Sequence, residues 1–469
     1  MEHDYDLIII GGGPAGYISA ERAGARGKRV LLVERAAIGG VCLNEGCIPT
    51  KTLLYSAKLY HLARDSARFG VQVGDVRYDL SAAMAHKART ITALQKGIMA
   101  QMKHHHVEFR RGEARLLGPG RVAVDGDELS SSFVLLANGG RAVLPPIPGA
   151  AESDRVLTSR EILDIETMPE RLVVVGGGYI GMEFAAYFAA LGCRVSVVEM
   201  TDEIIPMLEP QLAQALRKQL PDVDYRLGTR VSAIRDPGAD GDLAVALENG
   251  DGTPEELSAD LVLLAAGRAP NLEGAGFEQA GLDYNPSGVA VDEYLQTNLP
   301  GVYAAGDITG NMLLAHAAYR MGEVAVDHMF RAESGAAPAA GRQSWPNRLR
   351  LHAIPWVVFT MPEVAGCGLN ARDAAENGLD AVSTTLPLQV SGRYLAEHPR
   401  ERGTVTMVAE RGSGRLLGVQ MLGTGVGEII HSAAVMIEQE LRVSDIREIV
   451  FPHPTVSEAL RDAAWALEA

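Results

Sequence analysis

Cysteine is scarce in this chain, with only four among 469 residues. So few cysteines in so long a chain exclude the disulfide-stapled scaffold of small secreted domains. No run of about 18 apolar residues occurs, and we therefore expect no membrane-spanning helix. The acidic start, Met1 to Asp6, lacks the basic and apolar regions of a secretory signal. We expect a cytoplasmic protein.

Positive charge is also in short supply, because 59 acidic residues outnumber 43 basic ones and give a formal net charge of −16. A nucleic-acid partner would require a basic surface, so the composition argues against that class of function. An acidic surface keeps a protein soluble and suits a basic protein partner. The length exceeds what one hydrophobic core usually supports, and we expect roughly two to four domains.

The most informative feature that is present is an internal duplication. An apolar run, Tyr5 to Ile10, leads into the loop Gly11 to Gly16, then an Ala-rich helical stretch and a second apolar run that ends at Glu34. The same order returns later, with the loop Gly176 to Gly181 and the acid Glu199. In both copies the acid follows the first glycine by 23 positions.

Each copy has the parts of a dinucleotide-binding unit. The first glycine permits a tight turn, the second lets the backbone approach a pyrophosphate, and the third lets helix and strand pack closely. The helix N-terminus offers unpaired N–H groups to the phosphates, and the acid accepts a hydrogen bond from a ribose hydroxyl. We predict two such sites, one on Gly11, Gly13, Gly16 and Glu34, the other on Gly176, Gly178, Ile180, Gly181 and Glu199.

Glu199 also distinguishes between the two nicotinamide cofactors. A carboxylate accepts the free 2′-hydroxyl of NAD and repels the 2′-phosphate of NADP, whose binding needs a nearby Arg. Met200, Thr201 and Asp202 follow Glu199, and none of them is basic. The sequence therefore favours NAD.

Two of the four cysteines, Cys42 and Cys47, lie close together in the run that follows the first unit. A disulfide in a cytosolic protein is more often catalytic than structural, and a thiol pair beside a bound cofactor can close and reopen. A zinc site would need four ligands, usually in Cys-x-x-Cys pairs, and we expect no metal site. We interpret the pair as a redox relay, and Cys193 and Cys367 as small buried apolar side chains.

The run Gly39 to Lys51 resembles the redox-disulfide signature of the pyridine nucleotide–disulfide oxidoreductases, flavoenzymes with two dinucleotide-binding domains. The Leu-Asn and Ile-Pro details of the run are most similar to the branch that oxidises dihydrolipoamide for the 2-oxo acid dehydrogenase complexes. The resemblance extends almost end to end, through Ala304 to Asp307, Leu314 to His316, Ile354-Pro355, Thr360 to Ala365 and His453 to Glu458.

The resemblance implies an α/β fold with two Rossmann-like dinucleotide-binding domains, for FAD and for NAD, and a C-terminal α+β dimerisation domain. It implies a homodimer in which this last domain completes the partner subunit's active site. The implied domains are residues 1–145 (FAD, first part, with the redox disulfide), 146–270 (NAD), 271–345 (central, returning to the FAD domain) and 346–469 (interface). We expect a linker at Glu333 to Arg342, where small residues dominate.

Site residues follow from the same resemblance. Glu183 is expected near the nicotinamide, and Lys51 near the flavin ring. The FAD site is expected to comprise the first glycine unit with Glu34, Lys51, Ala114, Asp307, Leu314, Ala315 and His316. The NAD site is expected to comprise the second unit with Glu183, Glu199, Val231 and Gly267.

Thiol chemistry needs a base, because a thiolate is the attacking species in disulfide exchange. His453 is the candidate, with Glu458 five residues on to hold its ring in one tautomer. By resemblance, His453 of the opposite subunit deprotonates dihydrolipoamide, whose thiolate attacks Cys42, and Cys47 passes electrons to FAD and then to NAD. The implied partner is a separate lipoyl-bearing protein, either a 2-oxo acid dehydrogenase E2 component, a glycine-cleavage H protein or a similar carrier.

Two departures and two alternatives stay open. Glu45 stands between the thiols where the family usually has an apolar residue, and a carboxylate there disfavours a thiolate. Asn138 replaces a Thr that the family usually has near the flavin. The alternatives are another flavin-dependent disulfide reductase of the family, or a non-catalytic flavin-bound protein for redox sensing or docking. Against the second, all five expected catalytic residues are present, namely Cys42, Cys47, Lys51, His453 and Glu458.

Overall fold

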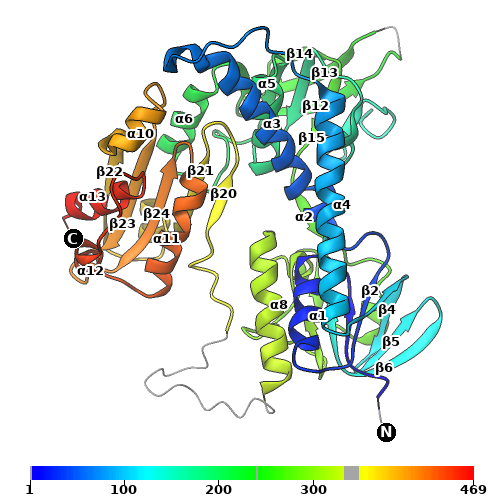
Figure 1. Ribbon diagram of the computed structural model, residues 1–469. Coiled ribbons are helices and arrows are strands. Elements are labelled where there is room, and N and C mark those ends of the chain that lie inside the picture. Colours follow the sequence, from blue (N-terminus) through cyan, green and yellow to red (C-terminus); the bar gives the residue numbers. More distant parts are fainter. Residues whose placement is uncertain (1–2, 239–240, 332–347, 469) are drawn as a thin grey trace. The chain divides into compact units, whose positions relative to one another are not determined.

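The computed structural model describes residues 3–238, 241–331 and 348–468, and the chain folds as two compact units (Figure 1). Unit 1 comprises Met1–Thr52, Ser81–Val143 and Gly267–Leu349, and unit 2 comprises Leu53–Leu80, Leu144–Ala266 and Arg350–Ala469. Unit 1 therefore joins stretches from the predicted first and third segments. The four-part domain division itself stays a prediction, and the predicted linker at Glu333 to Arg342 lies outside the described residues.

Unit 1 is built on a mostly parallel sheet in the order β3-β2-β1-β6, with β19 paired to the other side of β6. Ile8 of β1 is paired with Leu31 of β2 and with Val134 of β6, and all three are fully buried. Parallel strands that are covered on both faces have continuously apolar sequences, and the sequences of β1 and β2 are of this kind. The strands are β1 (Tyr5–Ile10), β2 (Val30–Glu34), β3 (Glu108–Arg111), β4 (Ala114–Gly118), β5 (Arg121–Val124), β6 (Asp127–Leu136), β7 (Gly140–Ala142), β16 (Arg268–Pro270), β17 (Tyr284–Asn285), β18 (Gly288–Val289) and β19 (Val302–Ala304).

Two helices of unit 1, α1 (Pro14–Gly24) and α8 (Ala315–Met329), lie side by side (Figure 1). They approach closely because small residues meet at their crossing. A Cβ on Gly322 would lie 2.6 Å from Ser19 Oγ and 2.7 Å from the Ala15 carbonyl oxygen. The other helices that begin or lie in this part of the chain are α2 (Gly40–Glu45), α3 (Cys47–Asp65), α4 (Leu80–His104) and α7 (Phe277–Ala280).

Unit 2 contains a second parallel sheet, in the order β11-β10-β9-β15-β8, beside a three-stranded antiparallel sheet. Arg171 at the start of β9 ties these parts together, since its guanidinium donates to Asp242 and Asp260 at 2.6 Å. The elements are β8 (Val156–Thr158), β9 (Arg171–Val175), α5 (Tyr179–Ala190), β10 (Arg194–Val198), α6 (Pro210–Gln219), β11 (Val223–Arg226), β12 (Thr229–Arg235), β13 (Leu243–Asn249), β14 (Pro254–Ala259) and β15 (Leu261–Leu264).

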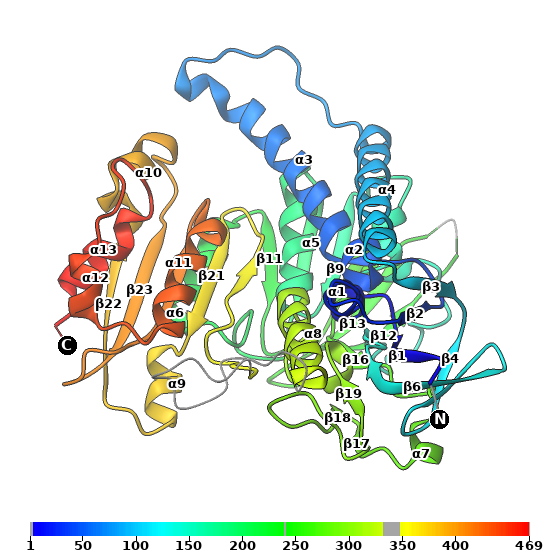
Figure 2. The same cartoon turned by 60° about the horizontal axis from the view of Figure 1, so that its bottom comes forward.

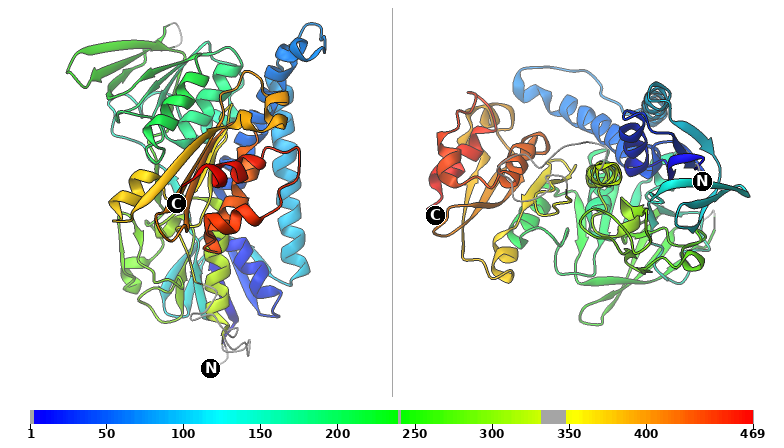
Figure 3. Two further views of the ribbon diagram at one scale, coloured as in Figure 1. Left: turned by 90° about the vertical axis from the view of Figure 1, so that its left-hand side faces the viewer. Right: turned by 90° about the horizontal axis from the view of Figure 1, so that it is seen from below.

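The remainder of unit 2 is an antiparallel sheet in the order β20-β21-β24-β23-β22, drawn in yellow to orange in Figures 2 and 3. Helices α11 and α13 pack into one core with β21, β23 and β24. The elements are β20 (Trp356–Val358), β21 (Val364–Gly368), α9 (Ala371–Glu376), β22 (Ala381–Pro387), α10 (Gly392–Glu397), β23 (Thr404–Glu410), β24 (Leu416–Leu422), α11 (Val426–Glu438), α12 (Val443–Glu448) and α13 (Glu458–Ala466).

Hydrogen bonds join this antiparallel sheet to the part of unit 2 that contains the parallel sheet and α6. The Glu209 carboxylate, before α6, accepts from the backbone N–H of Ala371 at 2.9 Å. At the far end of α6, Gln219 donates to the Arg402 carbonyl and accepts from the Arg402 N–H. Both ends of one helix are thus fixed by directional bonds. None of the described helices is long and apolar enough to cross a membrane.

A buried histidine in unit 1 makes the fold sensitive to acid. His328 is 8% exposed, stacks on Tyr294, and meets Tyr303 Oη through Nδ1 at 2.9 Å and Arg331 Nη1 through Nε2 at 2.8 Å. Arg can only donate, so Nε2 accepts and the imidazole is neutral. Burial and Arg331 lower the pKa of His328, and Asp292 opposes them.

We expect this histidine to cost stability below its ordinary pKa of 6.5. The unfolded chain then binds a proton that the folded chain resists, so stability falls as the pH falls, by up to about 1.4 kcal/mol per pH unit. Thermal unfolding at pH 7.5 and 5.5 should show a smaller loss in His328→Gln than in the wild type. The exposed His104 provides the control, His104→Gln. Equal pH dependence in all three proteins would contradict the assignment.

Candidate active site

The two glycine loops have the same geometry, which follows from how tightly each strand turns into its helix. Gly11 has φ +111°, and a Cβ there would lie 2.2 Å from the Ala137 carbonyl oxygen. A Cβ on Gly16 would lie 1.8 Å from the Gly11 carbonyl oxygen, and one on Gly181 would lie 2.0 Å from that of Gly176. No side chain fits at these contacts, so glycine is required at the predicted positions.

The two acids, Glu34 and Glu199, accept equivalent hydrogen bonds in the two copies. Glu34 accepts from the backbone N–H of Gly12 and of Ala36, both at 2.7 Å. Glu199 accepts from the N–H of Gly177 at 2.7 Å and of Thr201 at 2.8 Å. Each carboxylate is therefore fixed at the end of its strand beside the glycine turn. This is the position from which such an acid reaches a ribose hydroxyl.

Both helices begin beside open space. Gly13 and Gly178 are the N-caps of α1 and α5, and neither makes a side-chain cap. A Cβ on Gly178 would meet nothing within 4 Å, and one on Gly13 would meet only the Gly40 Cα, at 3.8 Å. The first N–H groups of each helix thus face room for a phosphate, as dinucleotide binding requires.

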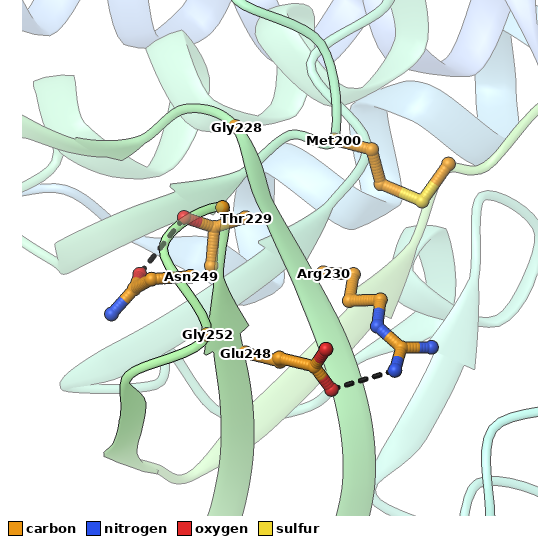
Figure 4. A pocket seen from close by; sticks show the side chains of 8 residues that line it. Met200, Gly228, Thr229, Arg230, Glu248, Asn249 and Gly252 are labelled. Atoms are coloured by element: carbon orange, nitrogen blue, oxygen red, sulfur yellow. Dashed lines mark hydrogen bonds and ion pairs between the residues drawn. The ribbon is translucent and has the colours of Figure 1, made fainter.

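A pocket in unit 2 is lined in part by Met200, which directly follows Glu199 in the chain (Figure 4). The backbone N–H of Thr229 donates to the Glu199 carbonyl. Arg230 in the pocket wall is paired with Glu248 at 2.6 Å. Val231, predicted for the NAD site, comes next on β12 and is 9% exposed.

In unit 1, the carboxyl ends of β1, β6 and β19 meet at one edge of the sheet. Asp307 follows β19, and burial raises its pKa while Arg268, at 3.4 Å, opposes that rise. Leu314 is the N-cap of α8, whose first two residues are Ala315 and His316. Ala114 opens β4, two residues after Gly112, whose N–H donates to the Glu34 carbonyl.

The thiol pair lies against the first glycine loop. The Gly39 N–H donates to the Gly12 carbonyl at 2.8 Å, and a Cβ on Gly40 would lie 2.6 Å from the Gly13 Cα. Cys42 stands on the short helix α2 that starts there, and Cys47 opens α3. Cys42 and Cys47 are not joined by a disulfide in this structure.

Electrostatics of the pair favour the protonated state. The hydrogen bond with Cys47 and burial both raise the pKa of the Cys42 thiol, and the Lys51 ammonium opposes the rise. Lys51 follows Cys47 by one turn of α3. A base is therefore needed before Cys42 can act as a thiolate. Burial likewise raises the pKa of Cys193 and Cys367 to about 12, as befits small buried side chains.

His453 and Glu458 form a dyad at the start of α13. Nδ1 of His453 lies 2.9 Å from Glu458 Oε1. The Thr455 N–H and the His453 ring lower the pKa of Glu458, which stays ionised and accepts the Nδ1 proton. This tautomer leaves Nε2 as the proton acceptor. The His453 side chain is 78% exposed.

Within unit 1, the structure brings together the predicted flavin residues and the thiol pair. Unit 2 holds the dyad, the second glycine loop, Glu199 and Glu183, which is 5% exposed and accepts from the Phe359 N–H at 3.1 Å. Gly267, predicted for the NAD site, is the first residue of the third segment of unit 1.

Sequence reasoning missed several residues around the thiols. Asn44 donates to the Gly40 carbonyl at 2.9 Å and accepts from Gln95 of α4 at 2.7 Å, which fixes α2. Tyr17 of α1 and Tyr319 of α8 share a hydrogen bond of 2.5 Å. Burial raises the pKa of both phenols, and an ionised Cys42 would raise it further. Asn44 was visible only as part of a motif, and nothing in the sequence marked Gln95 or Tyr319.

Comparisons with known proteins agree with this geometry. The family model described as "Pyridine nucleotide-disulphide oxidoreductase" matches residues 5–322. The model of that family's dimerisation domain matches residues 354–464. The chain is 37% identical to a dihydrolipoyl dehydrogenase of Pseudomonas aeruginosa, over 98% of this chain and 96% of that protein. It is 36% identical to one of Thermus scotoductus, over 99% and 97%.

A solved structure is similar as well. The HOCl-induced flavoprotein disulfide reductase RclA of Escherichia coli matches with a TM-score of 0.84 and 27% identity. The match covers 98% of this chain and 99% of that one.

Gly178 and Gly181 of the second loop should respond differently to the same substitution by alanine. Gly178→Ala adds a methyl group to the open space before α5, so we expect it to fold normally and bind NADH about tenfold more weakly. Gly181→Ala places the methyl against the Gly176 carbonyl, so we expect a lower Tm. Fluorescence titration and thermal unfolding of both variants measure these effects. Wild-type affinity in Gly178→Ala would contradict the phosphate assignment.

Proposed function

Because the chain belongs to the pyridine nucleotide–disulphide oxidoreductase family, we propose that it oxidises a protein-bound dihydrolipoyl group with NAD as the final acceptor. It is a flavin disulfide oxidoreductase that uses FAD and NAD. The observation that carries the proposal is the thiol pair seated against the first glycine turn. The full-length relatives named dihydrolipoyl dehydrogenase support the choice of substrate.

The residues present fit both cofactors. The first glycine turn, Glu34 and Asp307 would hold FAD, and the second turn with Glu199 would hold NAD. A Cβ on Gly178 would meet nothing within 4 Å and one on Gly13 would meet only the Gly40 Cα, so no side chain occupies the space before α1 and α5 that phosphates would need. When bound, the flavin supplies two-electron transfer between a dithiol and a nicotinamide.

Cys42 and Cys47 carry the disulfide exchange. A substrate thiolate attacks Cys42 Sγ, the Cys42–Cys47 bond breaks, and its electron pair stays on Cys47. The second substrate thiol, once deprotonated, attacks its neighbouring sulfur in the mixed disulfide. The bond to Cys42 then breaks, the substrate leaves as a cyclic disulfide, and the protein keeps the two electrons as a reduced thiol pair.

The dyad moves the protons of these steps. Nε2 of His453 takes the proton of the first substrate thiol and releases it to solvent, and it then takes the proton of the second thiol. Glu458 stabilises the imidazolium through Nδ1 in both steps. We place the chain in a homodimer, in which the dyad of one subunit serves the thiol pair of the other. The match to the family's dimerisation domain supports this arrangement. A cytoplasmic location remains our prediction, because reducing compartments suit a disulfide that is opened in every cycle.

The likeness to RclA over almost the whole chain supports a second candidate, a flavin disulfide reductase with a different disulfide substrate. Assays of the purified flavoprotein with dihydrolipoamide and NAD, and with lipoamide and NADH, separate the two. We expect turnover in both directions and a strong preference over NADP and NADPH. Absence of turnover with either lipoyl substrate would exclude the first candidate.

If His453 acts as the general base, replacing it should slow the reaction that involves substrate thiols and spare the reaction that bypasses them. We expect His453→Gln to slow dihydrolipoamide oxidation by about 10²- to 10⁴-fold, because a general base contributes that much. NADH oxidation by ferricyanide, which bypasses the thiols, should stay within about twofold of the wild type. His431→Gln, at an exposed position of α11, is the matched control. Equal losses in both reactions would show a structural defect instead.

Glu45 offers a further test. It ends α2 between the two thiols, and removing its charge should make a thiolate easier to form. We expect Glu45→Gln to be alkylated at Cys42 by iodoacetamide about two- to fivefold faster at neutral pH. Mass spectrometry of the reduced protein follows the reaction, with Glu113→Gln at an exposed site as the control. Identical rate profiles across pH would remove any electrostatic role for Glu45.

A further inference from the structure

Asn138 holds a polar atom that the described residues leave unsatisfied. Its side-chain oxygen Oδ1 is buried and has no hydrogen-bond partner among them. Leaving a buried acceptor unpaired is costly, so such atoms usually have a partner that completes them. The residue as a whole is only partly buried, so one side of it stays reachable.

The position of this atom in the fold is informative. Asn138 follows β6 by two residues, and the preceding Ala137 donates its N–H to the Ile10 carbonyl of β1. A Cβ on Gly11 would lie 3.2 Å from the Asn138 nitrogen. The chain runs from β1 through α1 to β2 on one side of β1, and β6 lies on the other side. Ligands of open α/β sheets bind at this switch point.

The backbone around Asn138 is held firmly, so the unpaired oxygen does not result from a loose loop. Asn271 donates through Nδ2 to the Asn138 carbonyl at 2.9 Å and through its N–H to the Gly139 carbonyl at 3.0 Å. Arg268 donates to the Gly140 carbonyl at 2.7 Å. A Cβ on Gly140 would lie 3.2 Å from Asp307 Oδ2. Asn138 therefore belongs to the same fixed edge as the glycine turn and Asp307.

We propose that Asn138 Oδ1 accepts a hydrogen bond from an O–H or N–H group of bound FAD. The inference rests on the flavin site of the proposed function. Phosphate oxygens are excluded as partners, because they accept hydrogen bonds as Oδ1 does. The remaining donors of FAD are its sugar and ribityl hydroxyls, the adenine amine and the N–H of the flavin ring. The family's usual Thr at this position would present a hydroxyl, whereas Asn presents an oxygen that can only accept.

The test compares apoprotein stability with FAD affinity in Asn138→Leu, which keeps the shape of the side chain and removes Oδ1. We expect FAD, titrated by quenching of its fluorescence, to bind about three- to tenfold more weakly. We expect the Tm of the apoprotein to be unchanged or higher, because an unpaired acceptor has been removed. Asn271→Leu is the matched control and should lower the Tm of the apoprotein, since it removes the side-chain hydrogen bond from Asn271 Nδ2 to the Asn138 carbonyl.

The outcomes separate this inference from the proposed function. Unchanged FAD affinity in Asn138→Leu, or a lower apoprotein Tm with unchanged affinity, overturns the inference alone. Failure of the wild-type apoprotein to bind FAD overturns the proposed function with it. Titration with ADP locates the donor, because a loss shared by ADP and FAD supports a donor on the adenosine half, and a loss seen with FAD alone supports one on the flavin half. Asn138→Ala repeats the experiment if the leucine variant does not fold.

Discussion

The contact between a glycine and the carbonyl oxygen five residues before it is the constraint on which both nucleotide sites depend. In each half of the chain, a hydrogen atom in place of a side chain lets the helix start directly at the end of its strand. That closeness lets Glu34 and Glu199 reach the N–H of the middle glycine from the neighbouring strand. It also leaves room in front of each helix N-terminus, where a phosphate binds.

The first glycine turn also positions the thiol pair. Gly39 and Gly40 pack against the first glycine loop, and the helix that carries Cys42 begins at that contact. Two ionisable groups are held in opposite states. Cys42 is held as a thiol by Cys47 and by burial, whereas Glu458 is held as a carboxylate by a backbone N–H. The charged Glu458 orients the ring of His453, the base that the proposed mechanism uses on the substrate thiols.

Much of this was predictable from the sequence, because the informative residues are close together along the chain. The glycine turns, their acids, the thiol pair and the His453–Glu458 dyad are all local patterns with a physical reason for their spacing. What could not be predicted depends on contacts between elements that are distant in the sequence. Gln95 of α4 meets Asn44 of α2 across 51 positions, and Asn138 follows β6, a strand that pairs with β1 from more than a hundred residues away. No pattern of spacing contains such contacts, since they exist only once distant helices and strands are packed together.

The discontinuity of unit 1 has a consequence for how the protein is made. A ribosome delivers the chain from its N-terminus, and domains generally fold as their residues emerge. The strands of the parallel sheet in unit 2 lie between Val156 and Leu264, so that sheet can close early. β19 and Asp307 emerge only afterwards. The nucleotide fold that comes second in the sequence is therefore the first that a nascent chain can complete.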